Sequence, residues 1–130
     1  MRLPARLLIL AAALAAGCGG QGGGAATTGP TATVPAAGVL RVSAREYSLN
    51  PARVMVGGPG ELRIKLRNRG SLPHDVRLER GGRDVGGTPP IPGGHSAAAT
   101  VALHPGRYEL LCTVGDHAQL GMRGVLHVKE

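Results

Sequence analysis

Short apolar–polar alternation broken by glycine and proline is the feature that most restricts the fold of this chain. The clearest segment is residues 61–69, ELRIKLRNR, in which Leu62, Ile64 and Leu66 share one face and basic side chains take the other. A period of two is typical of a β-strand with one buried face. Further strands are predicted at residues 39–44, 53–56, 74–80, 96–103, 107–113 and 123–129, with an irregular connection at 81–94. Seven or eight short strands without any helical period predict an all-β sandwich or barrel.

The N-terminal part of the chain does not fit this pattern and is expected to lie outside the folded domain. Basic residues precede an unbroken apolar run at residues 7–16, which is the arrangement of a secretory signal peptide over residues 1–17. The run of ten residues is too short to cross a bilayer, which takes about 20 residues. Residues 18–38 are rich in Gly, Ala, Thr and Pro and carry no charge, which predicts a flexible tether. One exported domain is therefore predicted at residues 39–130.

Cys18 follows the signal-like segment directly. The sequence LAAGC at residues 14–18 resembles the lipobox of bacterial lipoproteins, although Ala15 stands where that motif most often has Leu. The resemblance implies that Cys18 is acylated and anchors the protein to the extracytoplasmic or periplasmic face of a membrane. Ordinary signal cleavage nearby, which would leave Cys18 as a chance thiol, is the alternative. If Cys18 is acylated, Cys112 has no disulfide partner in the chain, and an unoccupied thiol is a liability in an oxidising compartment.

A cysteine, a histidine and a methionine recur at equal spacing in CTVGDHAQLGM, residues 112–122. Strand alternation directs Cys112 toward the interior, and the same pattern directs the more distant His74 inward. His117 and Met122 come from the loop that follows Cys112. A single inward His or Met is usually core filling. Two imidazoles, one thiolate and one thioether together are the donor set of an electron-transfer copper site.

These motifs resemble those of the cupredoxins, small proteins with one type 1 blue copper centre. The C-x4-H-x4-M loop is similar to those of auracyanin, rusticyanin and sulfocyanin, and the resemblance covers essentially all of residues 39–130. It implies a Greek-key β-sandwich that carries single electrons between redox proteins as a monomer, and not an enzyme. It also implies one copper ion with three equatorial ligands and one axial ligand, namely His74, Cys112 and His117 with Met122.

The same resemblance assigns supporting roles to residues beside the ligands. Asn68 and Asp75 are expected in the shell around the ligands, and Asp75 stands where related proteins commonly have Asn. The Asp75 carboxylate is expected to brace the two ligand loops, and its charge would favour Cu(II) and lower the reduction potential unless it is paired. An apolar patch around His117 is expected to dock redox partners. It consists of Leu72, Pro73, Ala118, Leu120 and Gly121.

The outer row of the clearest strand is basic and contains Arg63, Lys65, Arg67 and Arg69. This row is either a solvated face that keeps the sheet soluble, or a surface that attracts an acidic partner or anionic headgroups. The sequence favours the solvated face, because nothing else in it specifies such a partner. Nucleic acid is not an expected partner, since an exported chain with almost no aromatic residues offers no stacking platform.

Other functions remain open at this point. A copper chaperone or storage protein usually offers many Met or His residues, whereas this chain has three Met. A zinc site or a Cys–His enzyme is a second alternative, but no third orienting residue is evident. A non-redox domain of the same fold is a third. His95, His104 and His127 give no support to a second metal site, and the last two are expected on the surface.

Overall fold

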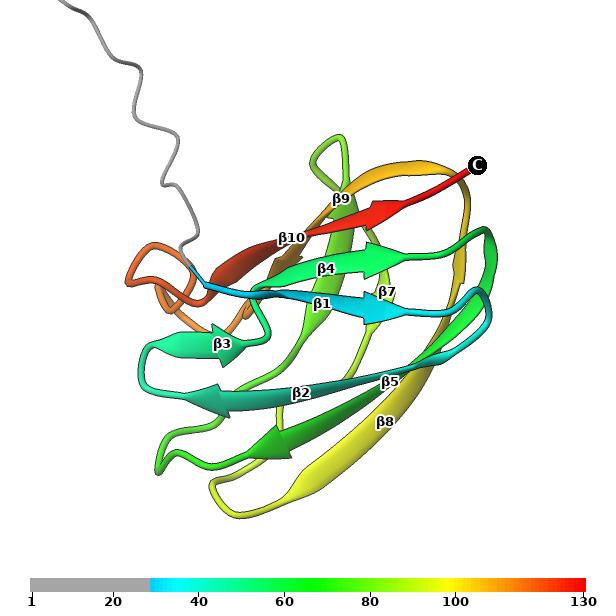
Figure 1. Cartoon of the computed structure of the whole chain (residues 1–130). Coiled ribbons are helices and arrows are strands. Elements are labelled where there is room, and N and C mark those ends of the chain that lie inside the picture. Colours follow the sequence, from blue (N-terminus) through cyan, green and yellow to red (C-terminus); the bar gives the residue numbers. More distant parts are fainter. Residues whose placement is uncertain (1–28) are drawn as a thin grey trace, which may run out of the picture.

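In a computed structural model, the structure of the protein is described for residues 29–130, and two β-sheets packed face to face make up this range (Figure 1). The all-β sandwich predicted from the sequence is confirmed. No helix among these residues is long and apolar enough to cross a membrane. The strands are β1 (Thr31–Val34), β2 (Val39–Arg45), β3 (Ser48–Asn50), β4 (Arg53–Val56), β5 (Gly60–Asn68), β6 (Arg77–Arg80), β7 (Arg83–Gly87), β8 (Ser96–Leu103), β9 (Gly106–Leu111) and β10 (Arg123–Val128).

The two sheets have mixed pairing. One contains six strands in the order β1-β4-β10-β9-β6-β7, and the other contains four in the order β3-β2-β5-β8. Strand β4 is parallel to both β1 and β10, and β2 is parallel to β5. Parallel neighbours cannot be joined by a tight hairpin, so the chain passes from β3 to β4 in the other sheet and returns to β5. These crossings tie the two layers together.

The core lies between the sheets and follows the alternation of the sequence. Leu62, Ile64 and Leu66 on β5 are all buried, and the basic residues between them face outward. Aliphatic side chains supply almost all of this core, and Tyr108 is its only buried aromatic residue among the described residues. A domain of this size depends on such close aliphatic packing, because it has little apolar area to spare.

Tyr108 joins the core to the turn before β9. Its hydroxyl accepts a hydrogen bond from the His104 N–H (2.9 Å) and donates one to the His104 carbonyl (3.1 Å). The Arg80 guanidinium donates a further bond to the Tyr108 hydroxyl oxygen (3.2 Å). We therefore expect Tyr108→Phe to lower the free energy of unfolding by about 1–2 kcal/mol in a urea titration. Tyr47→Phe, at an exposed ring, should change it by less than about 0.5 kcal/mol. Equal effects of the two substitutions would contradict this role.

Three strands were not predicted from the sequence, and one of them moves the domain boundary. β1 lies inside the predicted tether of residues 18–38, yet it pairs with β4 and buries Val34. The predicted start of the domain at residue 39 is therefore wrong, because backbone pairing orders a segment that has only one large apolar side chain. β3 and β7 are the other two, and β7 lies in the predicted irregular connection at 81–94.

The predicted strand at residues 74–80 is shorter than expected. Regular pairing of β6 begins only at Arg77, and His74 forms an isolated bridge with Ile91 instead. All strands of the described range and the core that they share lie within residues 31–128. The predicted signal peptide and Cys18 lie outside the described residues.

Candidate metal centre

Four predicted ligands gather at one end of the sandwich. The loop between β9 and β10 supplies Cys112, His117 and Met122, and Figure 1 shows this loop in orange at the left end, beside β3. His74 comes from the segment that precedes β6 in the same sheet. All four residues are buried, and His117, at 8% exposed, is nearest to the surface.

Three donor atoms of these residues face one another. His74 Nδ1 lies 3.2 Å from His117 Nδ1, and the Cys112 Sγ lies 4.0 Å from the first nitrogen and 3.7 Å from the second. The ligand atoms of these three residues all lie within 4.8 Å of one another. The structure thus brings together the three residues that the sequence predicted as equatorial ligands.

The spacing and chemistry of this cluster fit a single metal ion. Three atoms placed in a plane about 2.0–2.3 Å from one ion lie about 3.5–4.0 Å apart, close to the distances found here. Burial raises the pKa of the Cys112 thiol, because a thiolate is poorly solvated at this position. A bound cation reverses that effect by stabilising the thiolate, and two imidazoles with one thiolate suit copper or zinc.

Backbone hydrogen bonds hold the ligand loop in shape. The Cys112 N–H donates to the Met122 carbonyl (3.0 Å), and the Met122 N–H donates to the His117 carbonyl (3.0 Å). Met122 is fully buried beside Cys112, while its role as axial ligand remains a prediction. These bonds close the loop and hold the backbones of its three predicted ligands together.

Glu46 contacts His74 from the side away from the cluster, and this role was not predicted from the sequence. Its Oε1 accepts a hydrogen bond from His74 Nε2 at 3.0 Å and from the N–H groups of Ser71 (2.8 Å) and Leu72 (2.7 Å). These bonds, led by that from Leu72, lower the pKa of Glu46 to about 2. A carboxylate acceptor at Nε2 fixes the tautomer of His74 that leaves the Nδ1 lone pair free. Such carboxylate–histidine pairs orient metal ligands in proteins.

This contact predicts the effect of removing the Glu46 side chain. Glu46→Ala should weaken Cu(II) binding by about 10–100-fold, because His74 loses the partner that orients its ring. Competition with a chelator of known affinity measures the change. Glu46→Gln is the matched control, since an amide oxygen can accept the same three bonds without the charge. Unchanged Cu(II) affinity in Glu46→Ala would contradict an orienting role.

Asp75 and Asn68 support the two ligand segments. Asp75, which is 1% exposed, accepts hydrogen bonds from the Thr113 N–H (2.6 Å) and from the Thr113 hydroxyl. It thus joins the residue after His74 to the residue after Cys112. Asn68 donates to the carbonyls of Leu72 (2.8 Å) and Ile91 (2.9 Å), which fixes the segment that leads to His74.

The surface above His117 is partly apolar. Leu72 and Leu120 of the predicted docking patch are 41% and 50% exposed, and Ala118 is half-buried. Tyr47, which was not predicted to take part, lies edge-on to the His117 ring with 5.2 Å between ring centroids. His95, His104 and His127 are exposed, and the three-residue cluster contains none of them.

Solved structures of auracyanins and of rusticyanin share this architecture. An auracyanin from Roseiflexus castenholzii superposes with a TM-score of 0.66 and 18% identity, over 76% of this chain and 99% of that chain. Auracyanin A from Chloroflexus aurantiacus, a "blue" copper protein, gives 0.64 and 18%, over 73% and 99%. Reduced rusticyanin gives 0.57 and 19%, over 75% and 84%. No protein-family model and no curated protein sequence matches this chain.

The described domain therefore has the cupredoxin fold, and the resemblance drawn from the sequence is confirmed at the level of the fold. The His–Cys–His cluster lies where the ligand motif of the sequence predicted it.

Proposed function

We propose that this protein is an exported, monomeric blue copper protein that carries single electrons between redox partners. The observation that carries the proposal is the convergence of His74 Nδ1, Cys112 Sγ and His117 Nδ1 in a buried cluster at the end of a cupredoxin fold. Copper held by such a set supplies a one-electron Cu(II)/Cu(I) couple. Met122 is the proposed axial ligand, because its backbone is bonded to both Cys112 and His117.

The residues around the cluster serve electron transfer by limiting movement. Glu46 and Asp75 hold the two ligand segments through hydrogen bonds, and Asn68 fixes the approach to His74. Burial of the cluster excludes water from its donor atoms. Little reorganisation of ligands and solvent is then needed at each transfer, which is what an electron carrier requires.

Electrons are proposed to enter and leave through His117. Its ring is the most exposed of the ligand residues, and Leu72, Leu120 and Tyr47 present apolar surface at the same end of the domain. Small apolar patches of this kind support brief protein contacts. Electron self-exchange between two copies of the domain tests this surface without knowledge of the natural partner.

Leu120→Lys should slow self-exchange by about tenfold or more, because it places like charges opposite each other where two patches meet. Nuclear magnetic resonance line broadening in mixtures of oxidised and reduced protein gives the rate. Val85→Lys is the matched control, because Val85 is also an exposed apolar residue but lies on β7. This substitution should leave the rate unchanged. If both variants exchange at the wild-type rate, electrons do not leave through this patch. Absence of any reversible one-electron couple would overturn the proposed function itself.

The proposed location is the extracytoplasmic side of a membrane. The basic and apolar segments before Cys18 support export, and the lipobox-like sequence supports a lipid anchor at Cys18. Mass determination of the mature N-terminus tests this part of the proposal. A diacylglyceryl-modified Cys18 is the expected result, whereas an unmodified N-terminus elsewhere would restrict the proposal to export alone.

A further inference from the structure

We propose that the outer face of the four-stranded sheet docks on anionic lipid headgroups. This inference rests on the proposed extracytoplasmic location at a membrane, but it does not depend on copper. We name this surface the basic face. It consists of two residues of β2, three of β5 and the residue that follows β5, namely Arg41, Arg45, Arg63, Lys65, Arg67 and Arg69.

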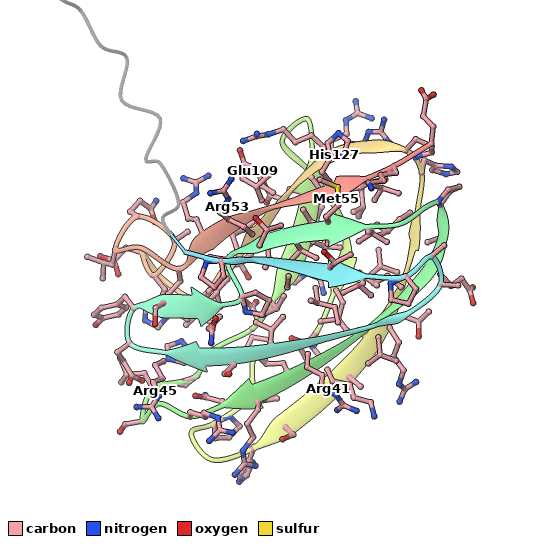
Figure 2. All side chains as sticks on the ribbon, in the orientation of Figure 1. Arg41, Arg45, Arg53, Met55, Glu109 and His127 are labelled. Atoms are coloured by element: carbon pink, nitrogen blue, oxygen red, sulfur yellow. The ribbon has the colours of Figure 1, made fainter. Side chains whose placement is uncertain are left out.

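Strand register doubles the width of the stripe that the sequence shows. β2 runs parallel to β5, with Arg41 opposite Lys65 and Ser43 opposite Arg67. The alternation of both strands sends these side chains outward, because Leu40, Val42 and Leu66 between them are buried in the core. Arg41 and Arg45 of β2 therefore stand beside the basic row of β5 on one face. Figure 2 shows Arg41 and Arg45 projecting from the outer side of this sheet.

The charges of the basic face are not neutralised within the described part of the chain. Two ion pairs in this range join Asp84 to Arg77 and Glu109 to Arg123, and the Glu46 carboxylate contacts His74, so none of these contacts includes a residue of the basic face. Glu61 is the single acidic residue in the outer row of β5. Unpaired like charges at this density raise the local potential and attract anions.

The other sheet lacks this concentration of charge. Its strands carry acidic and basic residues together, and both ion pairs of the described range, Arg77–Asp84 and Arg123–Glu109, lie on it. Figure 2 shows Arg53, Met55, Glu109 and His127 together on that side of the molecule. The net charge of the chain is a property of the whole molecule. It therefore does not explain why unpaired cations are concentrated on one sheet and not on the other.

The shape of the basic face lets a planar charged surface come close. The outer row of β8, next to β5, consists of the short side chains Ser96, Ala98, Thr100 and Ala102. A hollow of about 560 Å³ lies along this row, and the cations Arg41, Lys65, Arg67 and Arg69 line it together with Ser43 and Ser96. Long cationic side chains beside a low row can bind phosphate groups without a steric barrier.

The composition of the face favours lipid over a protein partner. The centres of protein interfaces usually contain desolvated aromatic or aliphatic anchors. Of the large hydrophobic residues exposed in the described range, only Val39 belongs to β2, β5 or β8, while Tyr47, Leu72 and Leu120 lie at the metal end. A face with many cations and almost no anchor is suited to an electrostatic contact with a headgroup layer. Docked in this way, the side of the sandwich meets the membrane and its metal end stays free.

Vesicle binding by the copper-free domain of residues 29–130 tests the proposal. We expect sedimentation with vesicles of phosphatidylcholine and phosphatidylglycerol, none with phosphatidylcholine alone, and loss of binding as salt is raised. Arg41→Gln/Lys65→Gln/Arg67→Gln should lower the partition coefficient by about 100-fold, at a factor of about five for each basic residue near the membrane.

The matched control is Arg53→Gln/Arg83→Gln/Arg107→Gln, which removes the same charge from exposed positions of the six-stranded sheet. It should retain most of the binding. Equal loss in the two triple variants would show that net charge alone is responsible and would overturn the proposal. Binding to polyglutamate but not to anionic vesicles would assign the face to an acidic protein and overturn it as well. Because no copper is present, failure of the domain to bind vesicles would not count against the proposed copper site. Conversely, a protein that binds these vesicles but forms no blue copper site would support lipid docking and contradict only the proposed function.

Discussion

Asp75→Ala is expected to lower the free energy of unfolding by about 2–4 kcal/mol. The substitution removes a buried carboxylate that accepts two hydrogen bonds from Thr113, and it leaves the Thr113 N–H without this acceptor. Hydrogen bonds to a charged group contribute about 1.5–3 kcal/mol, and the substitution removes two of them. Urea titration of the copper-free domain of residues 29–130 measures the change directly.

Thr113→Val provides the control for this prediction. It removes only the hydroxyl bond to Asp75 and keeps the backbone bond, so its cost should be about 1–2 kcal/mol. Asp75→Ala should therefore lower the free energy of unfolding more than Thr113→Val does. If Asp75→Ala unfolds at the wild-type urea concentration, the two ligand segments are not joined through this carboxylate.

Gly124→Ala is expected to cost about 3 kcal/mol of stability. Gly124 is the second residue of β10, just after the ligand loop, and a Cβ atom there would clash with the Ala52 carbonyl oxygen. The obstacle is backbone, so β10 must move away from the segment before β4. Overpacking of this kind typically costs about 1–3 kcal/mol, and a rigid backbone neighbour places this site at the upper end.

Gly57→Ala separates this steric effect from the general effect of replacing glycine. Its added Cβ would meet its nearest atom at 3.4 Å, an ordinary contact, so stability should change by less than about 1 kcal/mol. Thermal unfolding of both variants gives the comparison. Similar melting temperatures for the two proteins would show that β10 adapts to a side chain at Gly124.

The sequence allowed prediction of those parts of the structure in which alternation is strong. Leu62, Ile64 and Leu66 alternate with charged residues, so β5 was predicted within one residue of its observed bounds. β1 could not be found in this way, because it has no charge and only Val34 as a large apolar residue. Its order comes from pairing with β4, which is a tertiary interaction.

The same contrast applies to the site. His74, Cys112 and His117 were predicted because their residue types and spacing are specific to one kind of metal chemistry. Glu46 was not, because it lies 28 residues from His74 in a turn and reaches it only through the fold. The basic face shows the same limit, since Arg41 joins the stripe of β5 only through the parallel register of β2.

A visible absorption spectrum of residues 29–130 after addition of Cu(II), with Cys112→Ser alongside, is the decisive test of the copper site. The domain should start at residue 29 because β1 belongs to the fold. We expect an intense blue thiolate-to-copper band that is absent from the variant. Tight metal binding without this colour, or a preference for Cu(I) or zinc, would contradict electron transfer and favour copper handling or a structural role.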